Sequence, residues 1–207
     1  MSVVESTCAA LRDGGIALLV ESGSPATGAD LVLAASCATP EAMALVVRHG
    51  SGIVFAALPE HDADRLGLPR MVWYAEPPRG ASFAVTIDAR DGISTGISAA
   101  DRMRTVRLLA DPATTAGDFT RPGHVIPIRA HAAGVLGRPG RAEAALELLG
   151  FADAGTVGVL CRLVSAVQPT ELAAPDEIAD FAAQHRWPVV SVEDVVAYRR
   201  AEVSVAI

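Results

Sequence analysis

Short apolar runs alternate with amphipathic stretches along the whole chain. The apolar runs predict buried strands, and the amphipathic stretches have the apolar spacing of helices that bury one face. The expected strands are Ile16–Val20, Asp30–Ala35, Gly52–Leu58, Phe83–Asp88, His124–Ala130, Thr156–Val164 and Trp187–Val192. The expected helices are Val3–Leu11, Pro40 to near Gly50, Ser98–Ala110, Glu143–Leu149, Asp176–Gln184 and Glu193–Arg200. This order predicts one α/β (α+β) domain over residues 1–207, with a mixed sheet flanked by helices.

Two of the expected helices carry start signals. Thr39 precedes Pro40, which is the arrangement of an N-cap followed by proline at the first helical position. Ser98 and Asp101 have the spacing of a capping box. The stretches Glu21–Ala29 and Trp73–Arg79 are expected to be loops, the second of them ordered.

The composition is that of a globular protein, with 51% hydrophobic and 20% charged residues. No apolar run approaches the roughly 18 residues of a membrane span, so no membrane partner is expected. The N-terminal stretch lacks the basic and long apolar regions of a signal peptide. Cys8, Cys37 and Cys161 lie far apart and are expected to be reduced thiols in a cytoplasmic protein.

The charge pattern excludes several classes of function. The formal net charge is −7, and nucleic-acid backbones are bound through excess positive charge, so no nucleic-acid partner is expected. All 17 basic residues are arginine. A Schiff-base aldolase, a pyridoxal enzyme and a lysine-dependent phosphate loop are therefore excluded.

Taken by themselves, the polar motifs indicate little chemistry. GSPATGA follows a strand but lacks the spacing of a phosphate-binding loop, which favours an ordinary loop. His124 and His131 are seven residues apart along an extended segment, so they are expected to face opposite sides of a strand and not to share a metal. A hydrogen-bonded structural role is favoured for each. Cys161 lies in an apolar run and is expected to be a core thiol.

A long pair of motifs indicates a family. The stretch DARDGISTGISAADRMRTVRLLADP, followed by DFTRPGHVIPIRAHAAGVLGRPG, resembles 3,4-dihydroxy-2-butanone 4-phosphate synthase. The resemblance extends from about Glu5 to Arg199. It implies the fold of that family, a homodimer with active sites at the subunit interface, and formation of a four-carbon riboflavin precursor from ribulose 5-phosphate. It also implies a bound magnesium ion and carboxylates that transfer protons.

The chain departs from the family pattern in the loop after the first strand. Where the family has an acidic stretch of the type DDEDRENEGD, this chain reads ESGSPATGAD. Of the acidic residues in that pattern, the last aspartate is kept as Asp30. The metal-binding glutamate falls on Ala26, and the other changed positions are Glu21, Ser22, Pro25 and Gly28.

Further departures fall at the second metal ligand and at the catalytic glutamate. In the family motif GHTEA, which reads GRAEA here, Arg141 stands in for the ligating histidine and Ala142 for a phosphate-binding threonine. Arg162 stands in for the catalytic glutamate, and Phe55 for a cysteine. Because alanine and protonated arginine offer no lone pair to a cation, the sequence predicts neither a metal nor any other cofactor.

These departures predict a metal-independent lyase, isomerase or cyclase of specialised metabolism, without synthase activity. It would act on an enolisable, anionic small molecule, with Arg141 and Arg162 gripping a carboxylate or an enolate. One alternative is a non-catalytic relative that binds a sugar phosphate or pairs with an active paralogue. Another is a true synthase. The catalytic candidates are His124, Arg141 and Arg162, and the substrate-binding candidates are Arg138, Thr95, Asp30 and Glu21.

Overall fold

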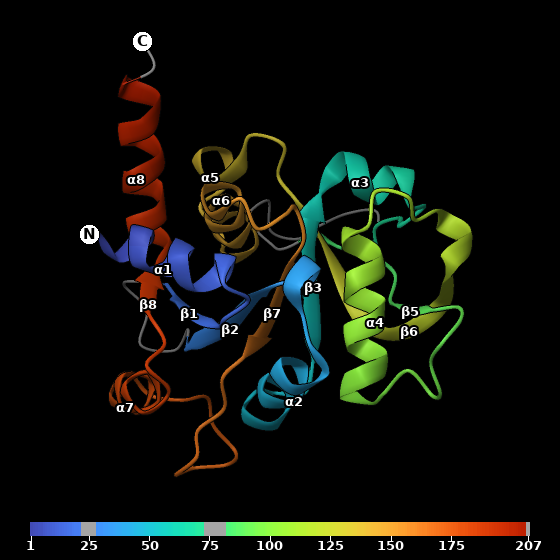
Figure 1. Cartoon of the computed structure of the whole chain (residues 1–207), viewed down its shortest axis with the longest axis horizontal. Coiled ribbons are helices and arrows are strands. Elements are labelled where there is room, and N and C mark those ends of the chain that lie inside the picture. Colours follow the sequence, from blue (N-terminus) through green and yellow to red (C-terminus); the bar gives the residue numbers. More distant parts are fainter. Residues whose placement is uncertain (22–27, 73–81, 206–207) are drawn as a thin grey trace.

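One mixed sheet with helices on both faces forms the body of the protein (Figure 1). The computed structural model describes residues 1–21, 28–72 and 82–205. The strands are β1 (Ala17–Val20), β2 (Ala29–Ala34), β3 (Val54–Pro59), β4 (Ser82–Phe83), β5 (Ile87–Ala89), β6 (Phe119–Ala130), β7 (Gly158–Arg162) and β8 (Val189–Ser191). The α-helices are α1 (Val3–Arg12), α2 (Pro40–His49), α3 (Glu60–Arg65), α4 (Ala99–Ala110), α5 (Gly134–Gly137), α6 (Arg141–Ala152), α7 (Pro175–His185) and α8 (Val192–Val205). Two short 3₁₀ turns lie at Ala35–Cys37 and Ala116–Asp118.

The strand order is β4-β6-β3-β7-β2-β1-β8, and β5 pairs with β6 beside this path. β3 runs parallel to β6 and β1 runs parallel to β8, whereas the remaining pairs are antiparallel. The expectation of a mixed sheet flanked by helices is therefore confirmed.

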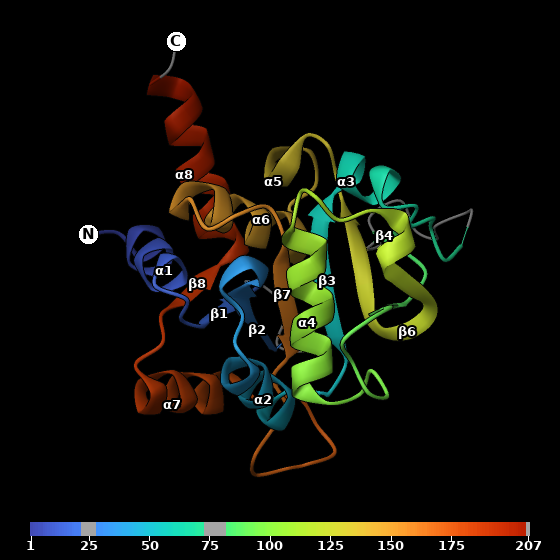
Figure 2. The same cartoon turned by 45° about the vertical axis from the view of Figure 1, so that its right-hand side comes forward.

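The alternation of side chains along each strand divides the core into two layers. On β1, Leu18 packs toward one face with residues of α2, α4 and α7, whereas Ala17 and Leu19 pack toward the other face with residues of α1, α5, α6 and α8. Figure 2 shows α2 and α4 side by side over the first face. The second face, which α6 covers, carries the cleft described below.

Most expected elements are present, with ends that differ by a few residues. The single strand expected at Phe83–Asp88 is wrong, because the chain forms the separate short strands β4 and β5. Between them the Ala84 and Val85 amides donate to the carbonyls of Pro127 and Pro69, and the register shifts at Ile87/Asp88. The expected loop at Trp73–Arg79 lies outside the described residues, as does most of Glu21–Ala29.

Several local expectations can be checked directly. Thr39 caps α2 by accepting a hydrogen bond from the Ala42 amide at 3.1 Å. The three cysteines are free, and Cys161 is fully buried in the core, where burial raises the pKa of its thiol. Within the described ranges, no helix is long and apolar enough to span a membrane.

Candidate active site

A cleft of about 290 Å³ lies where the N-terminal end of α6 meets the sheet. Side-chain alternation aims Asp30 of β2 and Arg162 of β7 toward α6, because they share the orientation of Val32 and Leu160, which pack on that helix layer. The lining residues are Glu21, Asp30, Phe55, Phe83, Ile128, Arg138, Gly140, Arg141, Ala142, Glu143, Leu160 and Arg162. The cleft therefore combines a hydrophobic wall with six charged side chains.

Asp30 is the centre of the charged side of the cleft. Its side chain is 5% exposed, and its two carboxylate oxygens face two different guanidinium groups. The Nε of Arg141 lies 3.1 Å from Oδ2, and the Nε of Arg162 lies 3.2 Å from Oδ1. Glu21 lies 3.8 Å from the Arg141 Nε. Burial raises the pKa of Asp30 to about 6, although the positive charge of Arg141 opposes this rise and the negative charge of Glu21 adds to it.

A second ion pair lies at the same end of α6. The side chain of Glu143 is 1% exposed, and its Oε1 accepts hydrogen bonds from the Arg138 Nε and the His131 amide, each at 2.8 Å. A terminal guanidinium nitrogen of Arg138 also contacts this carboxylate and donates to the Arg129 carbonyl at 3.1 Å. Glu143 therefore holds the Arg138 side chain in one position at the cleft.

Away from the cleft, His124 of β6 forms a hydrogen-bonded dyad with Asp88 of β5. Its Nδ1 lies 2.7 Å from the Asp88 Oδ2, and its backbone amide donates to Oδ1 at 2.9 Å. The His124 side chain is 42% exposed, whereas Asp88 is buried. Gly96, at φ +85°, lies against the dyad so closely that a Cβ there would be 2.1 Å from the Asp88 Oδ2. A histidine oriented by a buried carboxylate is a suitable proton donor or acceptor.

Asp101 holds the loop that carries Thr95. Its carboxylate accepts hydrogen bonds from the Ser94 amide at 3.2 Å, the Ser94 hydroxyl at 2.8 Å and the Gly96 amide at 3.0 Å. The expected capping box is thus only half formed. The Ser98 hydroxyl accepts from the Asp101 amide, but the Asp101 carboxylate binds the preceding loop.

The predicted site residues fall into two groups. Five of them, Glu21, Asp30, Arg138, Arg141 and Arg162, line the cleft, whereas His124 and Thr95 do not belong to its lining. Ile128, which does line it, is four residues farther along β6 than His124, a separation of about 13 Å along a strand. Within one chain the structure therefore does not bring His124 against the two arginines.

Sequence reasoning missed three residues that shape these groups. Glu143 lies in a helix expected from its apolar spacing, and Asp88 and Asp101 lie in the motif that carries the family resemblance. The available signal for Glu143 was an acidic residue two positions after Arg141, in a segment that is otherwise mostly apolar. The contacts of Asp88 depend on a strand far along the chain, and no local pattern reports them.

The donor set of the cleft does not fit a divalent cation. Among residues 1–21, 28–72 and 82–205, no group of three or more histidine, cysteine, aspartate or glutamate side chains could hold a metal ion. Each of the carboxylates of Glu21, Asp30 and Glu143 lies beside a guanidinium group. Magnesium requires several oxygen ligands, and here the carboxylate oxygens that could ligate it are already paired with guanidinium groups. Ala26, Ser22 and Pro25 lie outside the described residues.

The fold and the cleft define an α/β protein with a cleft lined by hydrophobic side chains and by three arginines. Residues 5–198 match the family 3,4-dihydroxy-2-butanone 4-phosphate synthase, and the chain belongs to this family. It is 45% identical over 197 residues to the riboflavin biosynthesis protein RibBA of Rhodococcus jostii, covering 95% of this chain and 47% of that protein. The corresponding protein of Salinispora tropica is 46% identical, with coverages of 95% and 49%. The chain thus spans about half the length of these curated relatives.

A solved structure of a 3,4-dihydroxy-2-butanone 4-phosphate synthase has the same fold as this chain. The crystal structure of 3,4-dihydroxy-2-butanone 4-phosphate synthase in complex with two magnesium ions superposes with a TM-score of 0.90 at 34% identity. The match covers 97% of this chain and 98% of that one. The fold expected from the family resemblance is therefore confirmed.

The relatives overturn the function predicted from the sequence. Proteins 42–46% identical over 95% of this chain are named for riboflavin biosynthesis. The prediction of a repurposed enzyme of specialised metabolism without synthase activity is wrong. It gave decisive weight to a few substituted positions, whereas the identity extends over nearly the whole chain.

We expect Glu143→Ala to lower the free energy of unfolding by about 3–5 kcal/mol, because it leaves the Arg138 guanidinium and the His131 amide without this buried acceptor. Glu202→Ala, at an exposed position of α8, is the matched control and should change stability by less than about 0.5 kcal/mol. Urea unfolding followed by circular dichroism measures both variants. Equal effects would show that the Glu143 pair does not stabilise the fold.

The Ser94 hydroxyl is the main cause that holds the pKa of Asp101 below its ordinary value, with the Ser94 and Gly96 amides contributing. The ionised carboxylate therefore stabilises the fold above its ordinary pKa near 4, and this contribution is lost as the pH falls through the lowered pKa of the folded state. We expect Asp101→Asn to be less stable than the wild type at about pH 7, with a difference that shrinks below about pH 4. Urea unfolding across this range tests the expectation, which a pH-independent difference would contradict.

Proposed function

We propose that this chain catalyses the 3,4-dihydroxy-2-butanone 4-phosphate synthase reaction, a lyase step that converts ribulose 5-phosphate into that product and formate. The two products together contain all the atoms of the substrate, so no oxidant or reductant is required. The observation that carries the proposal is the cleft itself. It places three arginines beside a hydrophobic wall, within a chain 42–46% identical to RibBA proteins over 95% of its length.

Arg138 is the candidate for binding the substrate phosphate. Arginine presents a planar array of donors that matches phosphate oxygens, and Glu143 fixes its side chain before the ligand arrives. Arg141 and Arg162 face the same cleft and stabilise negative charge on substrate oxygens after proton removal. Because the donor set does not fit magnesium, we propose that the reaction proceeds without a resident divalent cation.

His124 supplies the proton transfers in this proposal, and it does so from a second copy of the chain. Within one chain it lies away from the cleft, with Thr95 on the neighbouring loop. Large apolar side chains are exposed at both places, among them Phe83 at the cleft and Ile97 beside Gly96. Exposed apolar side chains of this kind are suited to a subunit interface, so we propose a homodimer with sites shared between the copies. The three free thiols are compatible with a cytoplasmic enzyme.

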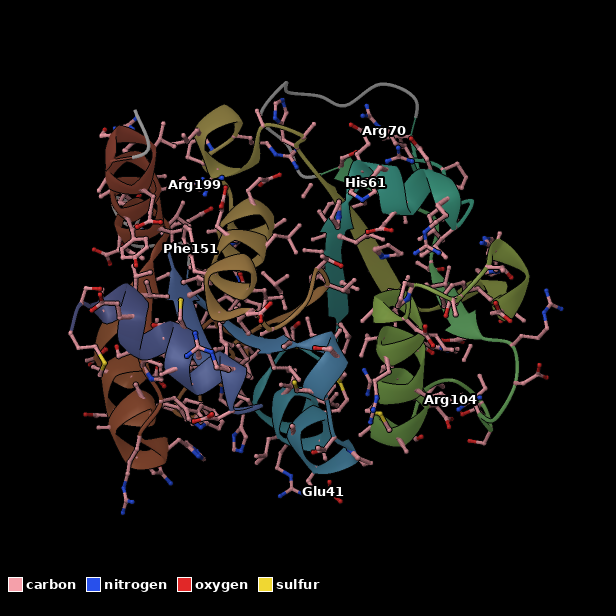
Figure 3. All side chains as sticks on the ribbon, turned by 45° about the horizontal axis from the view of Figure 1, so that its top comes forward. Glu41, His61, Arg70, Arg104, Phe151 and Arg199 are labelled. Carbon is pink, nitrogen blue, oxygen red and sulfur yellow. The ribbon has the colours of Figure 1, made fainter. Side chains whose placement is uncertain are left out.

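Incubation with ribulose 5-phosphate should release formate and 3,4-dihydroxy-2-butanone 4-phosphate in equal amounts, also in the presence of EDTA. Arg138→Gln should lower kcat/KM by about tenfold to a hundredfold, chiefly through KM, because it removes a charged phosphate donor. Arg199→Gln is the control, since this arginine on α8 lies beside Phe151 and Glu147 and outside the cleft lining (Figure 3). The reaction is followed by enzymatic detection of formate.

If formate is released no faster than in a solution without the protein, the proposed activity is refuted. Formate release that requires added magnesium would refute the metal-independent part alone.

The shared site predicts complementation between two impaired variants. At substrate concentrations far below KM, His124→Ala and Arg138→Ala should each lose at least about nine-tenths of the wild-type rate, whereas a mixture refolded at equal concentrations should recover about a quarter of that rate. Half of the dimers are then mixed, and each mixed dimer has one site with both wild-type residues. A mixture no more active than its components, although affinity capture of one tagged variant retains the other variant, would mean that both residues act within one chain.

A further inference from the structure

Asp30 joins two arginines that come from different layers of the fold. Arg162 lies opposite Asp30 on the neighbouring strand β7, and Arg141 opens α6. Each guanidinium approaches a separate carboxylate oxygen through its Nε, at 3.2 Å for Arg162 and 3.1 Å for Arg141. One buried carboxylate therefore fixes two planar groups next to each other in the wall of the cleft.

The surroundings restrict where these guanidinium groups can lie. The side chain of Arg162 is 16% exposed, and a Cβ added at Gly28 would be 3.4 Å from its Cδ. The chain thus passes Arg162 at a position with φ +58°, a conformation that glycine adopts most easily. Arg141 is held from two sides, by Asp30 and by Glu21. Side chains restricted before binding lose little entropy when a ligand arrives.

The arrangement suits an anion and opposes a cation. A guanidinium offers N–H donors in a fixed plane, and the side chains of Arg141 and Arg162 both line the cleft. Two such groups beside each other match a ligand with two adjacent anionic oxygens. A divalent cation beside Asp30 would instead meet two positive charges within 3.2 Å of the carboxylate that attracts it.

We propose that Arg141 and Arg162, fixed on Asp30, form an oxyanion-binding pair that binds two adjacent oxygens of an enolised substrate. This inference rests on the proposed function, because it assigns the reacting end of the substrate to the pair and the phosphate to Arg138. In it, Asp30 is a positioning residue that does not touch the substrate.

The test measures binding, so that it does not depend on turnover. Oxalate, a planar dianion with adjacent oxygens, is titrated calorimetrically into the wild-type protein in the presence of EDTA. We expect binding that weakens about tenfold to a hundredfold in Arg141→Gln and in Arg162→Gln, because each loses charged donors. Arg199→Gln should bind oxalate like the wild type. Arg141→Lys and Arg162→Lys keep the charge at Asp30 if the glutamine variants fail to fold, and they should also weaken binding because lysine lacks the planar fork.

A second measurement uses Mn²⁺, whose electron paramagnetic resonance signal falls when the ion binds. The wild-type protein should leave the signal of free Mn²⁺ unchanged. Loss of that signal, reversed by magnesium, would overturn the inference. Unchanged oxalate affinity in the folded arginine variants would also overturn it.

The outcomes separate this inference from the proposed function. Oxalate binding that needs both arginines, in a protein that releases no formate, supports the pair and refutes the synthase activity. Formate release with oxalate binding that is insensitive to both arginines supports the activity and refutes the pair.

Discussion

The buried carboxylate of Asp30 is the interaction on which the cleft depends. A charge inside a sheet is stable only if opposite charges and hydrogen bonds replace its hydration. Here the replacement comes from two directions, from Arg162 across the strand pair and from Arg141 at the start of α6. The same contacts tie the end of the helix to the middle of the sheet. The need to pair the buried Asp30 carboxylate therefore accounts for the positions of Arg141 and Arg162 in the cleft wall.

Small residues let α6 come close enough for these contacts. Ala144 and Ala145 are fully buried on the helix, and a Cβ added to Gly158 of β7 would lie 3.5 Å from that of Ala145. A larger residue at Gly158 would push the helix away from the sheet and lengthen the Arg141–Asp30 contact. At the start of the helix, a Cβ on Gly140 would be 2.7 Å from the Glu143 carboxylate. Close backbone packing thus supports both ion pairs.

The layers of the fold could be predicted from the sequence because apolar periodicity is local, and Thr39 shows that a cap can be identified in the same way. The roles in the cleft were not predictable in this way. Asp30 was expected to contact substrate, which stays a prediction, but its contacts with two arginines from distant segments could not be read from any local pattern. Glu143 was likewise not predicted, because its partners Arg138 and His131 precede the helix and the apolar spacing of the helix does not report these contacts. Substitutions at single positions indicated the new charges correctly, but they did not by themselves define the reaction.

The cleft and the His124–Asp88 pair differ in their exposure to water. The Arg138–Glu143 and Arg162–Asp30 ion pairs of the cleft are largely buried within one chain, so these charges interact in a lower dielectric than water, where electrostatic contacts are stronger. The His124 ring is 42% exposed although its carboxylate partner is buried. If the His124 ring transfers a proton as proposed, water at the ring would compete for that proton, and a covering surface would remove the competition. In the homodimer that we propose, a second copy of the chain with its own cleft placed over His124 would exclude this water, so the proposed assembly would complete the burial that the proposed proton transfer needs.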